Sequence, residues 1–412
     1  MIHFDRFTLT NGLTVLFHKD ETTPMVVVNT LFDVGARDEN PERTGFAHLF
    51  EHLMFGGSVN IPNFDGPLQR AGGQNNAFTS NDITNYYDVL PAQNLETALW
   101  LESDRMLSLA FTDKSLEVQR SVVIEEFKQR YLNQPYGDVW LELRPLAYKK
   151  HPYQWATIGK NIEQIETATM EEVKGFFKKF YTPQNAILCI AGNVELDTVK
   201  QLVEKWYGEI PAGEAYNRSL PQEPLQTEFR SKHIKRKVPN NAFYYAFKMP
   251  GKDQVGYYEA DLISDLLGRG KSSRLYRKLK KEKELVTEIS AFIMGSHDTG
   301  LLIISGFLND DVSFEALDLA LWNVIEDFKE TMVSDKELTK TVNQVKTTQV
   351  FSEEGVLAKA MLLCANEVLG DADKINTTLQ NYEQITPEMI HASAAEILDK
   401  NQCSRLTIEA IK

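Results

Sequence analysis

The order of predicted secondary-structure elements begins a second time halfway along the chain. Strand-like and helical segments that follow one another before residue 210 recur in a similar order after residue 227. Between them, residues 210–227 lack hydrophobic periodicity and are interrupted by Pro211, Gly213, Pro221 and Pro224. We therefore predict two related domains, residues 1–209 and 228–412, joined by an interdomain linker at 210–227.

Short connections join the predicted strands, which favours antiparallel pairing. Residues 7–17 place Asn11-Gly12, a preferred pair for a type I′ turn, between two alternating segments and so predict a β-hairpin. Further strands are predicted at 25–32, 76–90, 186–191, 242–247, 286–292 and 300–307. Helices are predicted at 94–109, 115–131, 170–180, 196–206, 257–267, 273–283, 314–332, 335–353, 356–369 and 387–398. The pattern indicates an α+β fold whose two units each pack helices on a mostly antiparallel sheet.

Charge and composition exclude several classes of partner. The chain has 412 residues and a formal net charge of −14, whereas nucleic acids and anionic membranes attract clustered Lys and Arg. The three cysteines are far apart and form no CxxC motif, which indicates a reducing compartment. No window approaches the ~18 consecutive apolar residues of a membrane span, and no signal peptide is visible. We expect a cytoplasmic protein that binds neither nucleic acid nor membrane.

The strongest chemical signal is the run His-Leu-Phe-Glu-His from His48 to His52. Its apolar neighbours repeat at helical spacing, and Thr44 is the expected N-cap. On a helix, His48 and His52 share one face, so both imidazoles can bind one metal ion, and zinc suits such ligands. Glu51 lies on the flank of that face, close enough to accept a proton from a water molecule. The order HxxEH is the inverzincin signature.

Two histidines on an ordinary helix, partly buried and hydrogen-bonded, are the alternative explanation. With 8 His and 58 Asp or Glu among 412 residues, a His-x-x-acid-His run arises by chance about 0.02 times in such a chain. The motif therefore needs support from the sequence around it.

That surrounding sequence resembles the M16 metallopeptidases, a family that includes pitrilysin, insulin-degrading enzyme and the mitochondrial processing peptidase. The segments that carry the resemblance are 35–39, 44–58, 71–80, 84–87, 151–153, 157–159, 180–186 and 270–276. Together they span essentially the whole chain, whose length matches the short branch containing the processing peptidases. The resemblance implies two homologous units of the processing-peptidase type, with a metal site only in the N-terminal unit.

The resemblance also implies a third metal ligand, a glutamate on a later helix, and residues 120–126 match that helix. Glu125 and Glu126 both are candidates, but neighbouring helical positions differ by about 100°, so only one can face the metal. Aligning the Val-Val-Ile run favours Glu126, whereas Glu125 lies on the side of Lys128 and is typical of a solvated face. Many relatives carry a supporting glutamate two turns earlier, where this chain has Gln119, which can orient a ligand but adds no charge.

Residues 75–80 are, by themselves, typical of an ordinary strand with polar and apolar sides. The resemblance implies that they form an edge strand on which a peptide substrate binds as an added strand, through sequence-tolerant main-chain hydrogen bonds. The substrate-binding residues so implied are Asn76, Ala77, Phe78 and Thr79. Phe78 is either a pocket wall or part of the core.

Two features of the second half bear on function. Residues 268–272 end in Gly-Lys-Ser, but Asp265 stands where a P-loop requires glycine and a predicted helix precedes the loop, so the P-loop interpretation is rejected. Many active relatives carry an Arg and a Tyr, seven residues apart, that reach the substrate. Lys280 and Thr287 stand at the matching positions here, and lysine lacks the bidentate fork of arginine.

The sequence therefore predicts a zinc-dependent endopeptidase that cleaves unfolded peptides inside a dimeric chamber. One Zn²⁺ per chain is held by His48, His52 and Glu126, and Glu51 acts as general base. A non-catalytic or only partner-activated assembly subunit is the alternative, because the family contains members without metal. Longer members have four units, so this two-unit chain is expected to dimerise. The missing Arg–Tyr pair favours a heterodimer with a relative that carries it, and a homodimer stays open.

Overall fold

The computed structural model describes residues 1–411 and divides the chain into two compact units. Unit 1 comprises residues 1–129, 155–220 and 350–377, and unit 2 comprises 130–154, 221–349 and the segment from Thr378 to the C-terminus. This division differs from the predicted continuous halves in two exchanged segments. Residues 130–154 of the N-terminal half belong to unit 2, and residues 350–377 of the C-terminal half belong to unit 1.

The sheet of unit 1 has the strand order β1-β2-β6-β3-β5-β4. Its strands are β1 (Asp5–Thr8), β2 (Thr14–Lys19), β3 (Met25–Phe32), β4 (Gln74–Thr79), β5 (Thr84–Pro91) and β6 (Ala186–Gly192). The pair β2–β6 is parallel, and the other neighbours are antiparallel. The strand predicted at 76–90 is thus a hairpin of two strands. Its turn is closed by Ser80, whose hydroxyl accepts the N–H groups of Asp82 and Ile83 at 3.1 and 3.0 Å.

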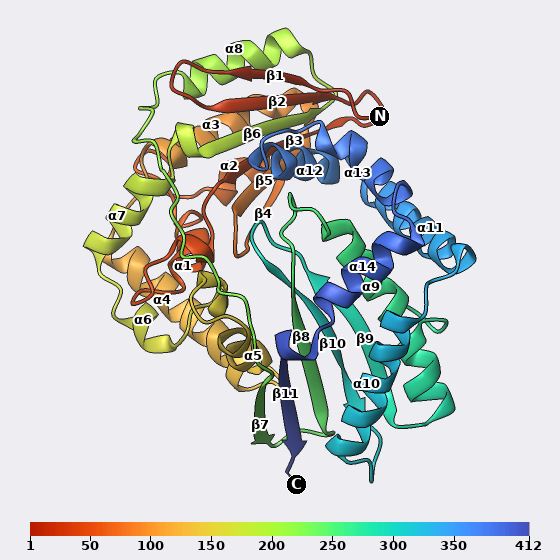
Figure 1. Ribbon diagram of the computed structural model, residues 1–412. Helices are drawn as coiled ribbons and strands as arrows, with labels where there is room; N and C mark the ends of the chain where they lie inside the picture. Colours follow the sequence, from red (N-terminus) through yellow and green to blue (C-terminus); the bar gives the residue numbers. More distant parts are fainter. Residues whose placement is uncertain (412) are drawn as a thin grey trace. The chain divides into compact units, whose positions relative to one another are not determined.

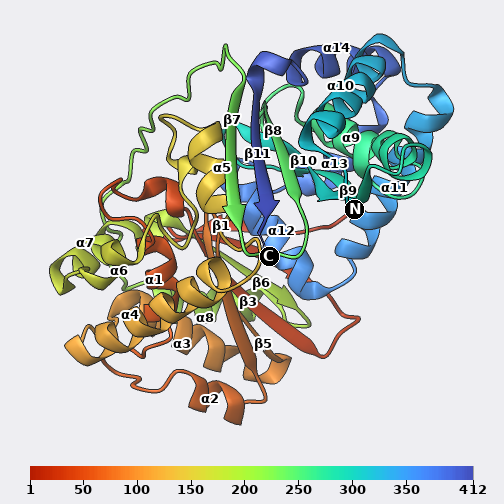
Figure 2. The ribbon, with the colours of Figure 1, turned by 90° about the horizontal axis from the view of Figure 1, so that it is seen from below.

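The sheet of unit 2 repeats this plan with the order β7-β11-β8-β10-β9. Its strands are β7 (Arg230–Arg236), β8 (Ala242–Met249), β9 (Val286–Met294), β10 (Gly300–Leu308) and β11 (Cys403–Ala410). Here β7–β11 is the parallel pair, and it occupies the place of β2–β6 in the first sheet. Figure 2 shows β7, β11 and β8 lying side by side. The duplicated, mostly antiparallel α+β fold is confirmed, although the sequence did not predict β7 and β11.

Helices cover both faces of the unit 1 sheet. On one face, α12 (Val356–Val368) packs on β3 and β6, where Ala360 and Leu363 join a core cluster with Val27 and Leu31 (Figure 1). On the other face lies α3 (Leu95–Leu107), and the Thr30 hydroxyl of β3 donates to Glu102 of that helix at 3.0 Å. Because α12 comes from the C-terminal half of the chain, the unit 1 core is complete only once that half has been made.

Unit 2 contains the reciprocal arrangement. Helix α5 (Val139–Ala147) packs on β8 and β11, which are the counterparts of β3 and β6, through Val139, Leu143 and Ala147. The other face of this sheet is covered by α9 (Tyr257–Gly268), α10 (Phe314–Glu330) and α14 (Pro387–Ile397). Each unit therefore takes one covering helix from the other half of the sequence. Periodicity reveals such a helix as amphipathic but not which of two similar sheets it will cover.

Five of the remaining helices were predicted, whereas those at 65–70, 162–166 and 374–383 were not. The remaining helices are α1 (Phe46–Leu53), α2 (Asp65–Arg70), α4 (Asp113–Phe127), α6 (Ile162–Glu166), α7 (Met170–Phe180), α8 (Leu196–Tyr207), α11 (Asp335–Ser352) and α13 (Lys374–Glu383). The helix predicted at 273–283 is a π-helical turn, η6 (Tyr276–Glu282). Within residues 1–411, no helix is both long and apolar enough to cross a lipid bilayer.

Residues 211–227 carry no helix or strand, yet side chains fix both ends of this segment. Arg218 pairs with Asp33 and Asp38 of unit 1 at 2.9 and 2.7 Å. Glu223, in unit 2, accepts the N–H groups of residues 149–151 and pairs with Lys248 at 2.8 Å. These contacts lower the pKa of Glu223 to about 2 despite its partial burial. The predicted linker therefore has no helix or strand but is held in place by the side-chain contacts of Arg218 and Glu223.

Candidate metal centre

Helix α1 carries His48, Glu51 and His52, and a glycine sets its start. Gly45 is the N-cap, with φ of 86° in the left-handed region. A Cβ atom there would lie 2.7 Å from the backbone carbonyl oxygen of Ile158, so a larger residue does not fit without a backbone shift. The predicted N-cap, Thr44, is wrong: its hydroxyl donates to the side chain of Gln164 instead.

A buried carboxylate caps this helix. Glu39 accepts the N–H groups of Gly45 and Ala47 at 2.9 and 2.8 Å, and the indole N–H of Trp155 at 3.0 Å. Ala47 directly precedes His48, so these bonds hold the first turn of the helix that carries both histidines. Burial raises the pKa of Glu39 to about 8, although the three donors act in the opposite direction.

Replacing Glu39 by Gln is expected to lower the free energy of unfolding at pH 5 by about 1–3 kcal/mol, because the amide NH₂ group, unlike the hydroxyl of the protonated acid, cannot accept a hydrogen bond from any of the three N–H donors. The folded-state pKa lies above the ~4.3 of an unfolded glutamate, so wild-type stability falls as pH rises from 5 to about 8. The Gln variant does not titrate here, and the penalty should therefore be larger at pH 5 than at pH 8. Denaturant unfolding at both pH values measures this, with Glu42→Gln, an exposed neighbour, as the control. Equal penalties for the two variants would contradict the capping role.

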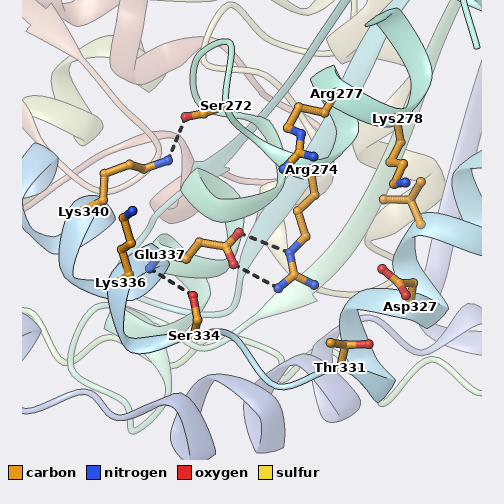
Figure 3. A pocket seen from close by; sticks show the side chains of 11 residues that line it. Ser272, Arg274, Arg277, Lys278, Asp327, Thr331, Ser334, Lys336, Glu337 and Lys340 are labelled. Atoms are coloured by element: carbon orange, nitrogen blue, oxygen red, sulfur yellow. Dashed lines mark hydrogen bonds and ion pairs between the residues drawn. The ribbon is translucent and has the colours of Figure 1, made fainter. Parts of the chain in front are cut away.

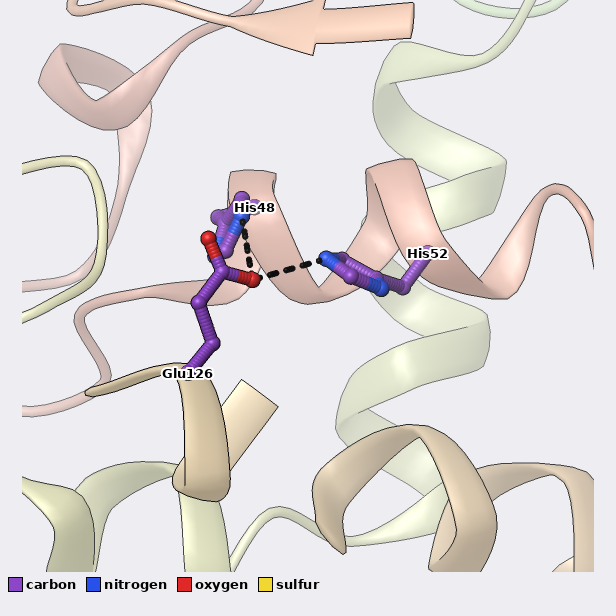
Figure 4. A group of neighbouring side chains, drawn as sticks. All are labelled: His48, His52 and Glu126. Atoms are coloured by element: carbon purple, nitrogen blue, oxygen red, sulfur yellow. Dashed lines mark ion pairs between the residues drawn. The ribbon is translucent and has the colours of Figure 1, made fainter. Parts of the chain in front are cut away.

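Glu126, near the end of α4, meets both histidines (Figure 4). Its Oε2 atom lies 3.6 Å from His48 Nε2 and 3.4 Å from His52 Nε2. One ligand atom from each of the three residues fits within 4.8 Å of the others. Ligands at ~2.0–2.1 Å around a tetrahedral zinc ion stand about 3.3 Å apart, so the spacing and the N/O donor set both suit zinc.

Glu125, the alternative candidate, lies on another side of α4. Its carboxylate pairs with Lys128 at 2.6 Å, and its side chain is 59% exposed. The Glu126 side chain is 17% exposed, which is similar to the 12% of His48 and the 24% of His52. The structure thus brings Glu126, and not Glu125, to the histidine pair.

The carboxylate of Glu51 is linked to the edge strand β4. Its Oε2 atom accepts a hydrogen bond from the Thr79 hydroxyl at 2.6 Å. Nearby, the buried hydroxyls of Tyr86 and Tyr181 lie 3.2 Å apart. Burial raises the pKa of both phenols, and the charge of Glu51 raises it further, so both stay protonated. Glu51 is half-buried, and the Thr79 bond fixes the position of its carboxylate beside the two histidines of the same helix.

Strand β4 lies at the edge of its sheet, with alternate side chains exposed. Phe78 is 40% exposed, so it is not part of the core. The Asn76 Oδ1 atom accepts the N–H of Ala77 at 2.8 Å. The side chain of Thr79 donates a hydrogen bond to Glu51, and the substrate contact expected of Thr79 stays a prediction. The strand therefore presents the Asn76 amide and the Phe78 ring at the edge of the sheet.

The remaining sequence-predicted positions lie in unit 2. The Lys280 ammonium sits over the Tyr276 ring, 5.4 Å from its centroid, and the Thr287 hydroxyl donates to the Phe307 carbonyl at 3.4 Å. The glycine-rich loop follows α9, which agrees with the rejection of a P-loop.

Comparisons with known families match both halves of the chain. Residues 14–159 match the model of the insulinase family, peptidase family M16, and residues 167–345 match the model of the M16 inactive domain. The zinc protease PqqE of Helicobacter pylori is 32% identical over 347 residues, which make up 82% of this chain and 77% of that protein.

Solved structures match over the full chain. The crystal structure of a protease from Helicobacter pylori superposes with a TM-score of 0.92 at 28% identity and covers 99% of this chain and 100% of that one. The periplasmic protease PqqL from Escherichia coli shares the fold, with a TM-score of 0.82 at 18% identity. There the match covers 99% of this chain but 48% of PqqL.

Proposed function

Because the chain belongs to peptidase family M16, we propose that it is a zinc-dependent endopeptidase of the HxxEH type that cleaves unfolded peptides. The observation that carries this proposal is the spacing of the ligand atoms of His48, His52 and Glu126, with Glu51 beside them. A packed core does not require two imidazoles and a carboxylate at this spacing in a half-buried position.

In this proposal His48, His52 and Glu126 hold one zinc ion per chain. Zinc, when bound, supplies a Lewis acid that activates water and polarises a carbonyl. Glu51 accepts a proton from the attacking water and returns it to the leaving amine. The Thr79 hydroxyl orients the Glu51 carboxylate through the 2.6 Å bond, so that one oxygen stays directed for proton transfer.

The substrate would bind along β4 as an added strand, which accepts any extended backbone and therefore favours unfolded peptides. The side-chain oxygen of Asn76 accepts the hydrogen bond of the Ala77 N–H group. The Asn76 side chain must therefore rotate away before a substrate carbonyl can accept that hydrogen bond. Once turned, it can bond the peptide itself. The exposed Phe78 ring provides apolar contact for substrate side chains.

We expect the purified, zinc-loaded chain to hydrolyse an unfolded peptide, to lose this activity on chelation and to regain it with added zinc. The same protein substrate in its folded form should resist cleavage. Zinc content near one ion per chain supports the enzyme, whereas a chain that binds no zinc and cleaves nothing in any mixture would favour the non-catalytic assembly subunit.

We further propose that the chain works as a dimer. It spans 48% of PqqL, so two copies supply a comparable length. Lys280 and Thr287 replace the Arg–Tyr pair of many active relatives, which favours a heterodimer with a relative that carries the pair. The activity assay should therefore include the chain alone and the chain mixed with that relative. Full activity of the chain alone, retained in Lys280→Ala, would contradict the heterodimer.

A cytoplasmic location of this chain stays a prediction. The structural neighbour PqqL is named a periplasmic protease.

A further inference from the structure

Unit 1 buries the carboxylate of Asp88, on strand β5, without a hydrogen-bond donor. The residue is completely shielded from solvent, with 0% of its surface exposed. Within residues 1–411, no N–H or O–H group bonds to either of its carboxylate oxygens. Burying an ionised carboxylate without a partner is strongly unfavourable. The charge of Asp88 must therefore be removed in some other way.

Glu337 of unit 2 shows how the same chain accommodates an ionised carboxylate that is partly withdrawn from solvent. It accepts two hydrogen bonds from the Arg274 guanidinium, at 3.2 and 3.1 Å (Figure 3). Its side chain also stays 25% exposed, in the wall of a cavity of about 710 Å³. Asp88 has neither an arginine that bonds it nor contact with solvent, so the ionised form is much less favourable there than at Glu337.

A second buried carboxylate, that of Glu102 on α3, lies within hydrogen-bonding reach of Asp88. Glu102 is 2% exposed, and its oxygens accept hydrogen bonds from the Thr30 hydroxyl at 3.0 Å and from Nη2 of Arg105. Two ionised carboxylates repel each other and have no proton to share. A protonated Asp88, by contrast, can donate its O–H to Glu102. One proton thus gives both side chains a favourable contact.

Arg105, the cation beside these two carboxylates, balances only one of them. Its guanidinium bonds Glu102 through Nη2 and packs against the rings of Phe64 and Tyr86, whose centroids both lie 4.5 Å from Cζ. The Nε and Nη1 atoms of Arg105 bond no acceptor in the described part of the chain, and thus none of Asp88. One positive charge therefore faces two carboxyl groups, and a proton supplies the missing neutralisation.

The other groups around Asp88 favour the same protonation state. Burial raises the pKa of the Tyr86 phenol on β5 and of the Tyr207 phenol on α8, so both stay neutral. Asp65, exposed at the start of α2, adds a negative charge that disfavours ionisation of Asp88. Burial, followed by the charge of Glu102, raises the pKa of Asp88 well above its usual range.

We propose that Asp88 and Glu102 share one proton and form an alkaline-sensitive latch between the β4–β5 hairpin and helix α3. With the proton in place, the bond from Asp88 to Glu102 ties β5 to α3. Once the pH rises far enough, the proton passes to solvent and two like charges face each other across this contact. The hairpin is then released from α3, including β4, whose Asn75 lies opposite Asp88 in the sheet.

Release of the hairpin would also reach the candidate metal centre, because β4 carries Thr79, which bonds Glu51. This consequence rests on the proposed function, whereas the shared proton does not. The experiments below therefore measure protonation, stability and local opening, and none of them depends on peptidase activity.

Asp88→Asn keeps a hydrogen-bond donor toward Glu102 but cannot titrate. In the wild type, Asp88 holds its proton when folded at pH values where an unfolded aspartate, with a pKa of ~3.9, has lost it. Unfolding then releases one proton. The ratio of the unfolding constants, wild type over Asp88→Asn, should therefore rise about tenfold per pH unit from pH 5 until the pair ionises. Denaturant unfolding of the full chain measures the ratio, in which the titration of Glu39 cancels. Asp197→Asn, on the exposed face of α8, should give a ratio that does not change with pH.

Two measurements test the proton and the latch directly. In Glu39→Gln, which removes the other buried acid, the infrared C=O stretch of a protonated carboxylic acid should persist at pH 7 and disappear when Asp88→Asn is added. Hydrogen exchange followed by mass spectrometry, with both proteins at the same pH, should show faster exchange of β4 and β5 in the wild type than in Asp88→Asn at alkaline pH. At pH 6 the wild type should exchange no faster than the variant.

Three results would overturn the proposal. The first is a ratio of unfolding constants that does not change with pH for Asp88→Asn. The second is the absence of the carboxylic-acid band at pH 7 in Glu39→Gln. The third is stabilisation of the wild type, but not of Asp88→Asn, by sodium or potassium relative to tetramethylammonium at equal ionic strength, because a bound cation would then take the place of the proton.

Discussion

Glu51→Gln is expected to abolish peptide hydrolysis while the zinc site stays filled. The amide cannot accept the proton, so we expect kcat to fall about a thousandfold or more, as is usual when a general base is lost. His48, His52 and Glu126 are untouched, and Gln is nearly the same size as Glu. Zinc content by atomic absorption and steady-state hydrolysis of an unfolded peptide measure the two properties on the same sample.

Thr79→Val is the matched comparison for this variant. It removes the 2.6 Å bond to Glu51 but keeps the base, so its loss of kcat should be smaller than that of Glu51→Gln. A Glu51→Gln protein that binds zinc and cleaves peptides at the wild-type rate would show that another group takes the proton. A variant that loses zinc as well would mean that Glu51 helps to hold the metal.

Glu126→Ala is expected to lower zinc affinity at least about a hundredfold, because one of three protein ligands is lost and two imidazoles remain. Glu125→Ala provides a control on the adjacent residue of the same helix. It removes only an exposed pair with Lys128, worth under about 1 kcal/mol, and should leave zinc binding unchanged. Competition with a chromogenic chelator gives both affinities.

The reverse result, with zinc lost from Glu125→Ala and kept by Glu126→Ala, would move the third ligand by one residue. Equal zinc loss in both variants, with lowered thermal stability, would indicate damage to α4 instead of loss of a ligand. Because the two side chains point about 100° apart on one helix, the pair separates ligation from helix stability.

Local patterns in the sequence predict most of the fold. The strand at Met25–Phe32 and the helix at Met170–Phe180 were predicted with the bounds that the structure has, because hydrophobic periodicity and turn residues act over a few neighbours. The same holds for the His48–His52 motif, where i and i+4 on a helix suffice to bring two imidazoles together. The hairpin around Asn11-Gly12 and the duplicated plan are also local in origin, although Gly12 has a φ of 89° and Asn11 has no positive φ, so the turn is not the type I′ turn that this pair favours.

Tertiary contacts decided the rest. The exchange of α5 and α12 between the units depends on which sheet each helix covers, and two similar sheets offer similar apolar faces. The meeting of Glu126 with the histidines depends on how α4 packs against α1, although family resemblance pointed to that residue. The capping role of Glu39 was not predicted, because Glu39 lies six residues before Gly45 and reaches the start of α1 across a loop. Sequence patterns for helix caps cover only the residues next to the helix start.

The sequence by itself thus determined most of the helices and strands, the duplicated plan and the pairing of the two histidines, because those depend on neighbours within a few residues. Glu51 and Glu126 were expected from the motif and the resemblance, and only the tertiary structure decided what the carboxylates contact: Glu126 lies beside the histidines, Glu51 accepts a hydrogen bond from Thr79, and Glu39 is buried under the helix start. The physical reason is that the interaction of a charged group depends on its distance in space from its partners, which local sequence patterns do not encode.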